Sequence, residues 1–504
     1  GVVEGGQGDA LLQSGHYGVV DEHGAGELLA AMDHAVSDGV DLGHALDHAV
    51  LGAGESVEDG LNGLRVGGHG DVELVLAVGG GHLVGQAAVD ADALTETLGV
   101  CSAKIAIIIV DHSEEKNNPL FRKKSNFFRL EVPAMNIVGI IAEYNPFHLG
   151  HARQIAETRR ALGDCAVVCA MSGHWVQRGE CALTDKWTRA GMALRGGADL
   201  VLELPTPWAT SSAESFARGG VGILAAAGVV DTLSFGSEGG DTAPLYRAAA
   251  CLDSEEYRTA LRRFLDKGLP FAACRQAAVE ELLGREAALC LSRPNDNLAV
   301  EYLRALPERM GALAVRRVGA EHDGAPVGGY ASASAIRGWL RCGKIQRAEA
   351  YLPEPWQGDV ASMEWCERAV LSRLRTMCPE EAERLPDSGE GVAARLISAG
   401  RAARSLEELY ALAKTKRYAH ARIRRLALWA YLGLAAEDRP ERAPYLRVLG
   451  FNERGRAVLR EMEGRAQAPI LTKPAHARDL EPAARRLFEL EARCTDLYGL
   501  CFAE

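Results

Sequence analysis

The chain has 504 residues, of which 47% are hydrophobic and 25% charged, with a formal net charge of −12. No run of 18 successive apolar residues occurs, and no secretory signal stands at either candidate start, so membrane and secreted proteins are excluded and a cytoplasmic location is expected. The 12 cysteines include no Cys-x-x-Cys pair, which favours scattered reduced thiols over a disulfide framework or a zinc ribbon.

The first part of the chain differs from the rest in composition. Residues 1–100 hold 17 of the 68 acidic residues and 22 of the 55 glycines, but a single basic residue, Arg65, and no proline. Their apolar residues follow neither a helical nor a strand period, and a strand at Leu74–Val78 would have no evident partner. The chain begins with Gly, and Met135 directly precedes the first clear strand. We interpret residues 1–134 as a leader that results from a wrong start, or alternatively as a genuine acidic, disordered extension.

From Met135 onward, short apolar runs alternate with amphipathic segments. This alternation predicts an α/β fold with a doubly wound parallel sheet over residues 135–340, in which a ligand binds at the carboxyl ends of the strands. The predicted strands are Ile137–Ile141, Cys165–Met171, Leu200–Leu204 and Thr232–Phe235, and the predicted helices between them are Ala152–Leu162, Thr184–Arg195 and Ala213–Ala226.

The exit of the first strand carries the most informative motif. The run Asn145-Pro-Phe-His148-Leu-Gly150-His151 leads from the strand into a helix. Gly150 would let phosphates approach the backbone, and the helix start would offer free N–H groups and a positive dipole end. The two imidazoles would then face the charge that grows when the α-phosphate of a nucleotide is attacked. The motif predicts nucleotidyl transfer, with a solvated histidine pair as the alternative; no third ligand at suitable spacing supports zinc.

Polar residues also follow the later strands. After the second strand, residues 171–180 form a Gly-rich loop that contains Arg178, and Asp185 and Lys186 follow it. This loop is interpreted as a segment that closes over a small acid or a pyrophosphate, and a plain surface turn is the alternative. After the fourth strand, Gly236 permits close packing of an adenine or ribose. Each signal is weak by itself.

Three further segments complete the first domain. Pro294-Asn-Asp-Asn297 is expected to be a loop that opens the helix Leu298–Leu306, and Val315–Gly319 a strand with basic residues at its end. Ser332-Ala-Ser334-Ala-Ile-Arg337 is expected to open a helix whose hydroxyls either cap it or bind phosphate oxygens.

The segment 345–504 is predicted to be an α-helical domain. Residues 401–430 contain eight basic and two acidic residues, with His420 and Arg424 on one helical face. A basic face with Tyr418 and His420 able to stack on bases predicts RNA binding, and an ordinary solvated face is the alternative. The expected helices are Arg368–Leu374, Val392–Ala399, Ser405–Lys414, Arg422–Leu434 and Arg456–Met462.

Five segments taken together resemble the bacterial tRNA(Met) cytidine acetate ligase family, in the same order over nearly all of 135–504. They are residues 139–151, 171–180, 203–205, 235–238 and 416–425. The resemblance implies a Rossmann-like nucleotidyltransferase domain that activates acetate with ATP as acetyl-adenylate. The acetyl group then passes to N4 of the wobble cytidine, position 34 of elongator tRNA(Met).

The resemblance also implies site residues. From the charge that develops at the phosphates, catalysis is assigned to His148 and His151, with Lys186 as a further catalytic candidate. The sequence leaves open whether Lys186, Arg178 or Arg337 neutralises the pyrophosphate. Ser332 and Ser334 are further phosphate candidates, and Mg²⁺ is expected on the phosphates. The residues implied in tRNA binding are Lys416, Arg417, Tyr418, His420, Arg424 and Arg425. The residues implied in ATP binding are Ile141, Ala142, Glu143, Tyr144, Asn145, Pro146, Phe147, His148, Leu149, Gly150, His151, Ala152, Arg153, Gln154, Gly236, Asn295 and Arg317.

The chain departs from the family pattern at two positions. At the first, Asn297 stands where an apolar residue is expected, so it stays open whether Asn295 or Asn297 is the asparagine that binds ATP. At the second, Ala333 stands where a hydroxyl residue is expected. Two other functions share part of the pattern, namely a small-molecule adenylyltransferase and a non-catalytic RNA-binding protein with a relic nucleotide pocket. The sequence leaves the oligomeric state open.

Overall fold

The computed structural model describes residues 73–76, 106–109, 135–319, 326–415 and 418–503. The chain divides into two units, Gly1–Met135 and Asn136–Glu504. In the first unit, β1 (Glu73–Leu76) pairs in parallel with β2 (Ala106–Ile109). The expectation that a strand here has no partner was therefore wrong. The rest of residues 1–134 lies outside the described residues, so both interpretations of this segment stay predictions.

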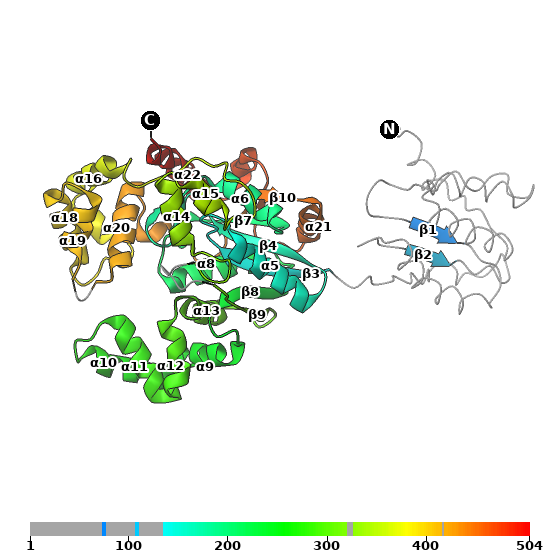
Figure 1. Cartoon of the computed structure of the whole chain (residues 1–504), viewed down its shortest axis with the longest axis horizontal. Coiled ribbons are helices and arrows are strands. Elements are labelled where there is room, and N and C mark those ends of the chain that lie inside the picture. Colours follow the sequence, from blue (N-terminus) through cyan, green and yellow to red (C-terminus); the bar gives the residue numbers. More distant parts are fainter. Residues whose placement is uncertain (1–72, 77–105, 110–134, 320–325, 416–417, 504) are drawn as a thin grey trace, which may run out of the picture. The chain divides into compact units, whose positions relative to one another are not determined.

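The second unit is built on a seven-stranded sheet with the order β11-β10-β7-β4-β3-β8-β9 (Figure 1). Five strands pair in parallel, as predicted, while β10 (Leu446–Phe451) runs antiparallel to β7 and parallel to β11 (Ile470–Leu471). The α/β doubly wound fold is confirmed. The parallel strands are β3 (Asn136–Ala142), β4 (Cys165–Ser172), β7 (Leu200–Leu204), β8 (Thr232–Ser237) and β9 (Gly311–Arg316).

Alternation along β3 places its side chains against different helices on the two faces of the sheet. Val138 and Ile140 belong to a core that includes Ile155 of α5 (Leu149–Leu162) and Ala190 of α6 (Lys186–Arg195). On the other face, a Cβ at Gly139 would lie 2.6 Å from Leu224 Cδ1 of α8 (Ala213–Ala226). All eight residues of β4 are buried, because this central strand is covered on both faces.

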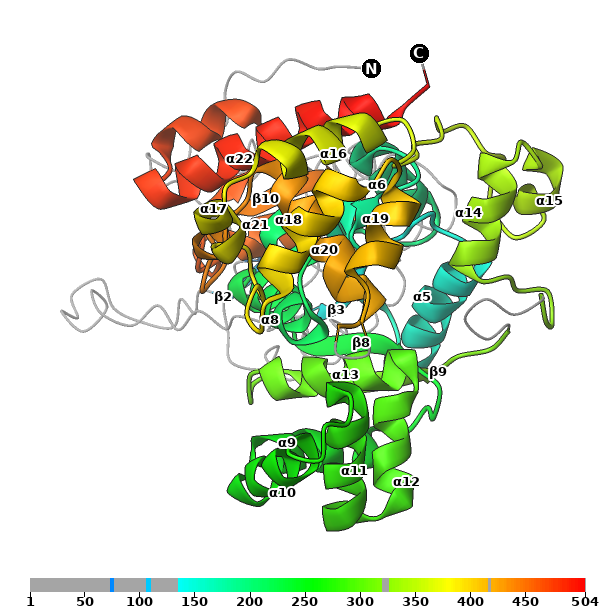
Figure 2. The same cartoon turned by 90° about the vertical axis from the view of Figure 1, so that its left-hand side faces the viewer.

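Five helices lie between β8 and β9, and α9 to α12 group together in both views (Figure 2). The last of the five, α13, begins at Pro294, so the expected loop at 294–297 is its first turn. The expected strand Val315–Gly319 was misplaced, because β9 ends at Arg316. The helices are α9 (Thr242–Asp253), α10 (Glu255–Leu265), α11 (Phe271–Leu283), α12 (Arg285–Leu289) and α13 (Pro294–Ala305).

The segment after β9 is mainly helical, as expected, and α16, α18, α19 and α20 form one group (Figure 2). Their shared core includes Leu374, Leu396 and Trp429, and it reaches Trp175, which follows β4 in the chain. Strands β10 and β11, which were not predicted from the sequence, return this segment to the edge of the sheet. The principal helices are α14 (Ala333–Arg341), α15 (Ile345–Glu349), α16 (Glu367–Thr376), α17 (Pro379–Glu383), α18 (Val392–Ala402), α19 (Leu406–Ala413), α20 (His420–Leu432), α21 (Glu453–Met462) and α22 (Pro482–Tyr498).

Among the helices of the described residues, none combines the length and apolar character needed to cross a membrane.

Candidate nucleotide site

Buried aromatic side chains anchor the loop between β3 and α5. Phe147 is fully buried, and a Cβ at Gly196 would lie 2.2 Å from its ring, so Gly196 leaves room for it. The ring of Tyr144 meets those of Phe147 and His151 edge-on, with centroid distances of 4.9 Å in both cases. Tyr144 also bonds Cys169 Sγ at 3.4 Å through its hydroxyl. The loop is therefore held rigidly at the carboxyl edge of the sheet.

His148 and His151 form a stacked pair in this loop. Their ring centroids are 3.8 Å apart. The Nδ1 atom of His148 accepts a hydrogen bond from the Gly150 N–H at 3.0 Å, and Nδ1 of His151 accepts one from the His148 N–H at 3.3 Å. Because both Nδ1 atoms act as acceptors, each neutral ring carries its proton on Nε2. The pair thus offers two Nε2–H donors in fixed orientations.

The surroundings keep both rings neutral. Burial, together with the positive charges of Arg317 and Arg337, lowers the pKa of His148 to about 3. Burial also lowers the pKa of His151 well below its ordinary value, with His148 and Arg317 adding to the effect. These histidines therefore act as neutral hydrogen-bond donors in the free protein, and they add no cationic charge to the site.

The start of α5 offers less to a phosphate than the sequence predicted. The N–H of Leu149 bonds Tyr351 O at 3.0 Å, the N–H of Gly150 bonds the His148 ring, and the N–H of His151 bonds His148 O at 2.8 Å. These groups are not free, so only the helix dipole remains available there. A Cβ at Gly150 would lie 2.8 Å from His148 Cε1, so this glycine makes room for the imidazole.

Strands β8 and β9 bring further predicted ATP-binding residues to the same edge. A Cβ at Gly236 would lie 3.4 Å from Arg317 Cγ, which places the two residues side by side. Helix α5 is tied to these strands, since Arg153 Nη1 donates to Arg316 O at 3.0 Å and Gln154 Nε2 donates to Ser234 O at 3.4 Å. The structure therefore gathers the residues 141–154, Gly236 and Arg317 at one edge.

The start of α13 meets the end of β8. Asn295 Nδ2 donates to Glu238 Oε1 at 2.6 Å, and the Glu238 N–H donates to Asp296 Oδ1 at 2.9 Å. Asn297 instead accepts from Arg275 Nη1 of α11 at 3.2 Å. Of the two asparagines that the sequence left open, Asn295 is the one bonded to the segment after β8.

The start of α14 contacts the histidine loop. Ser332 caps the helix, since its Oγ accepts from the Ala335 N–H at 3.2 Å. Arg337 donates to Asn145 O at 2.8 Å and to Ser334 Oγ at 3.2 Å. Ser332 and Ser334 thus have partners within the protein, and Arg337 lies beside the loop that carries the histidines.

Lys186, which was predicted to be catalytic, is engaged in an ion pair within the protein. Its side chain is buried, and Nζ bonds Glu203 Oε1 at 2.6 Å. Arg447 Nη1 lies 3.2 Å from the other Glu203 oxygen. The ammonium group is held in an internal ion pair, so the structure gives no support to Lys186 as a ligand of pyrophosphate. Arg178, in contrast, is exposed on the loop between β5 (Trp175–Val176) and β6 (Glu180–Cys181).

A second fully buried cation of α6, Arg189, was not predicted from the sequence. Its guanidinium donates to Glu143 O at 2.6 Å, Ser172 O at 3.1 Å and Thr184 O at 3.0 Å, and also to Gly173 O. It therefore ties the carboxyl ends of β3 and β4 together. Its spacing of three residues from Lys186 puts both cations on one helical face, which is the only signal that the sequence offered.

The hairpin β5–β6 connects this edge to the basic helix α20. The Gln177 N–H donates to Glu143 Oε1 at 2.9 Å, and burial raises the pKa of Glu143. A Cβ at Gly179, whose φ is +74°, would lie 2.6 Å from the backbone of Arg424. The hairpin thus contacts the end of β3 with one residue and α20 with another.

The predicted RNA-binding residues are only partly exposed. Tyr418 is buried with its hydroxyl bonded to Glu390 O, so the expectation that it stacks on bases was wrong. His420 is exposed, whereas Arg424 is half-buried, with Nη2 3.2 Å from Glu180 Oε2. Burial lowers the pKa of the half-buried Arg425. Lys416 and Arg417 lie outside the described residues.

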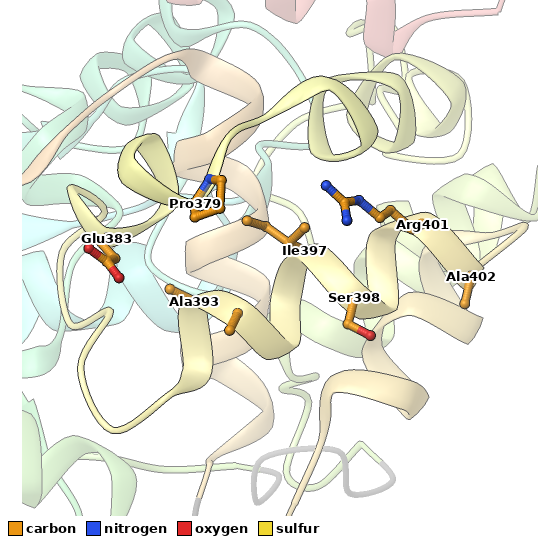
Figure 3. A pocket seen from close by; sticks show the side chains of 8 residues that line it. Pro379, Glu383, Ala393, Ile397, Ser398, Arg401 and Ala402 are labelled. Atoms are coloured by element: carbon orange, nitrogen blue, oxygen red, sulfur yellow. The ribbon is translucent and has the colours of Figure 1, made fainter.

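A separate hollow lies between α17 and α18 (Figure 3). Its walls are mainly apolar, with Arg401 and Glu383 at its borders. None of the predicted nucleotide or RNA residues lines it, so it has no part in the site at the sheet edge. The lining residues are Pro379, Glu383, Ala393, Ala394, Ile397, Ser398, Arg401 and Ala402.

The mostly parallel sheet presents paired imidazoles at the exit of its central strand β3, which is the arrangement that the histidine motif predicted for nucleotidyl transfer. In agreement, the family model described as HIGH Nucleotidyl Transferase matches residues 135–504. Two relatives, both called tRNA(Met) cytidine acetate ligase, come from Thermoanaerobacter sp. (strain X514) and Acetivibrio thermocellus. The first is 36% identical over 393 residues, which cover 73% of this chain and 96% of the relative. The second is 33% identical over 397 residues, which cover 73% of this chain and 95% of the relative.

Solved structures agree. Apo TmcAL from Thermotoga maritima matches with a TM-score of 0.70 and 32% identity over 73% of this chain and 96% of that chain. A second form of the same protein, bound with alpha-thio ATP, matches with a TM-score of 0.67 and 31% identity. This match covers 73% of this chain and 95% of that chain. This chain therefore belongs to the tRNA(Met) cytidine acetate ligase family.

Proposed function

We propose that this protein uses ATP to activate acetate as acetyl-adenylate and transfers the acetyl group to N4 of the wobble cytidine of elongator tRNA(Met), giving N4-acetylcytidine. The observation that carries this proposal is the stacked pair His148 and His151 at the exit of β3. The names of the relatives support the tRNA substrate, and the neighbour bound with alpha-thio ATP supports the nucleotide.

In the first step, a carboxylate oxygen of acetate attacks the α-phosphorus of ATP, and the bond from that phosphorus to the bridging oxygen of pyrophosphate breaks. Acetate is ionised near neutral pH and needs no general base. The two Nε2–H groups donate to phosphate oxygens as negative charge grows on them. Fixed donors of this kind supply most of the acceleration in such reactions.

The arginines beside the pair would receive the pyrophosphate. Arg337 donates to Asn145 O in the histidine loop at 2.8 Å, and Arg317 lies beside Gly236 at the same edge of the sheet. We assign Arg337 to the leaving pyrophosphate, with Arg178 of the hairpin as a second candidate. Lys186 has no part in this step, because its ammonium group is bonded to Glu203.

Mg²⁺ would enter with the nucleotide. Within the described ranges, no group of three or more His, Cys, Asp or Glu side chains could hold a metal. An ion carried on the phosphates keeps most of its waters and screens their charge. The histidines and arginines act alongside it on the remaining oxygens.

In the second step, the N4 amine of the cytidine attacks the acetyl carbonyl carbon, AMP leaves, and the amine loses a proton. The base must be unpaired, as a wobble base is. Helix α20 is our proposed RNA surface, through His420, Arg424 and Arg425, with Lys416 and Arg417 just before it. Replacing Arg424 with Ala is expected to weaken tRNA binding and to flatten its salt dependence by up to about one unit of slope.

Two assays test the proposal. Purified protein incubated with ATP, acetate and tRNA is expected to yield N4-acetylcytidine on nucleoside analysis, and it should exchange labelled pyrophosphate into ATP in an acetate-dependent manner. Exchange without any modified tRNA would point to a small-molecule adenylyltransferase. Binding of tRNA with neither exchange nor modification would point to a non-catalytic RNA-binding protein.

A further inference from the structure

Glu180, the first residue of β6, faces three arginines that come from two different helices. Its Oε1 lies 3.9 Å from Arg337 Nη2, and its Oε2 lies 3.2 Å from Arg424 Nη2 and 3.9 Å from Arg341 Nη2. The carboxylate is 9% exposed, so it interacts with these cations largely out of water. One buried anion therefore serves both α14, at the nucleotide site, and α20, the proposed RNA surface.

The backbone around Glu180 is fixed on both sides. Gly179 leaves no room for a Cβ against the backbone of α20, and Gln177 bonds the Glu143 carboxylate at the end of β3. Since the hairpin itself is held in place, a change in the charges around Glu180 is met by its side chain and by the arginines. The guanidinium of Arg424 also lies 5.4 Å from the ring centroid of Tyr410, so its charge is held between this ring and Glu180.

We propose that Glu180 is a positioning residue that makes ATP binding and tRNA binding antagonistic. The inference rests on the proposed function. When the phosphates of ATP bind Arg337, the buried Glu180 carboxylate loses one of its cations. Its negative charge is then compensated mainly by Arg424, which is held more tightly. When an RNA phosphate engages Arg424, Glu180 depends on Arg337 and Arg341. Removal of both partners at once leaves a buried carboxylate poorly paired, which is costly.

This competition predicts an order for the reaction. Release of pyrophosphate returns Arg337 to Glu180, and Arg424 then becomes available to RNA at a lower cost. tRNA should therefore bind more tightly after acetate has been activated than while the triphosphate is in place. By linkage, tRNA must weaken ATP binding by the same factor by which ATP weakens tRNA binding.

The test compares the Kd of tRNA(Met) in the presence of saturating α,β-methylene-ATP with the Kd in the presence of saturating AMP. The full-length parent is expected to bind tRNA about fivefold more weakly with the triphosphate, at the lower end of typical coupling between sites. In E180Q, which has no carboxylate to share, the ratio should fall below about twofold. E281Q is the matched control, because it removes a carboxylate from the exposed Arg263–Glu281 pair, and it should keep the parental ratio.

A second variant guards against a folding defect in E180Q. R424Q removes the RNA-side partner and should also abolish the difference, and the double variant E180Q, R424Q should show no further change. A parental ratio near one, or a fivefold ratio that persists in E180Q, would overturn the inference. Failure to bind or acetylate tRNA under any condition would instead contradict the proposed function itself.

Discussion

The imidazole of His151 stacks on that of His148 with 3.8 Å between ring centroids, and the backbone N–H of His148 bonds Nδ1 of His151 at 3.3 Å. The same two residues are therefore coupled through both ring and backbone, and the orientation of one determines that of the other. Both Nε2–H groups are presented as a unit. This relationship explains how neutral rings provide directed hydrogen bonds to a phosphate.

Glu491 of α22 gives the protein a pH-dependent stability. Its carboxyl accepts from the Thr206 N–H and bonds Thr206 Oγ1 at 2.7 Å, and burial followed by the charge of Glu203 raises its pKa to about 7. A raised pKa means that the folded state binds more protons than the unfolded state. The stabilising contribution of Glu491 to the free energy of unfolding is therefore fully present below about pH 4.5, and it is lost as the pH rises through 7. The full loss should be on the order of 3 kcal/mol, from about 1.4 kcal/mol for each unit by which the pKa is raised.

Urea denaturation at pH 5 and pH 8 measures this effect. The parent should lose more free energy of unfolding between the two pH values than E491Q does, because the amide does not titrate. E489Q changes an exposed carboxyl on the same helix and should behave like the parent. An E491Q variant with the parental pH dependence would show that this carboxyl does not control it.

The ion pair of Lys186 with Glu203 is expected to act in folding. K186M leaves Glu203 with less compensation in a buried position, and loss of one partner of such a pair typically costs about 3–5 kcal/mol. The double variant K186M, E203Q removes both charges and should recover part of that stability. Pyrophosphate exchange by the folded double variant should exceed that of K186M. If K186M folds as the parent does but loses exchange, Lys186 is catalytic after all.

Gly179 and Gly163 form a matched pair for testing the contact between the hairpin and α20. Both have positive φ, +74° and +76°, but a Cβ at Gly179 meets the backbone of Arg424 at 2.6 Å, while a Cβ at Gly163 meets nothing within 4 Å. G163A should cost about 1–3 kcal/mol through conformational strain alone, because ψ of −155° places Gly163 in a backbone region that only glycine adopts readily. G179A should cost at least about 1 kcal/mol more, because a backbone must shift. Equal losses in thermal or urea denaturation would refute the close contact.

The sequence predicted the sheet because its parallel strands are short, mainly apolar and bounded by turn residues. It also predicted the histidine pair, since the motif is local and lies at a strand exit. The strand β10 was missed because its residues combine apolar side chains with Arg447 and Gly450 in a region of strong helical patterns. Its place in the sheet depends on pairing with β7, which lies more than 200 residues earlier in the chain.

The roles of charged residues were harder to predict than their positions. Lys186 and Arg189 differ little in sequence from exposed cations, and only the fold shows that Glu203 and the backbone carbonyls at the ends of β3 and β4 receive them. Tyr418 was expected to be a surface residue from its basic neighbours, yet its ring is buried beneath Arg422, whose guanidinium lies 5.5 Å from its centroid. Hydrophobic periodicity predicts which face of a helix such as α20 is buried. It does not predict the burial of Tyr418, because this residue precedes the helix.

The central claim is that the stacked imidazoles stabilise the charge that develops at the α-phosphate. The most direct test is acetate-dependent pyrophosphate exchange by the H148A, H151A double variant, with folding verified by thermal denaturation. Loss of two directed donors should lower kcat by about 100-fold or more, since single donors of this kind are worth about that much. A folded double variant that exchanges pyrophosphate at the parental rate would contradict the account.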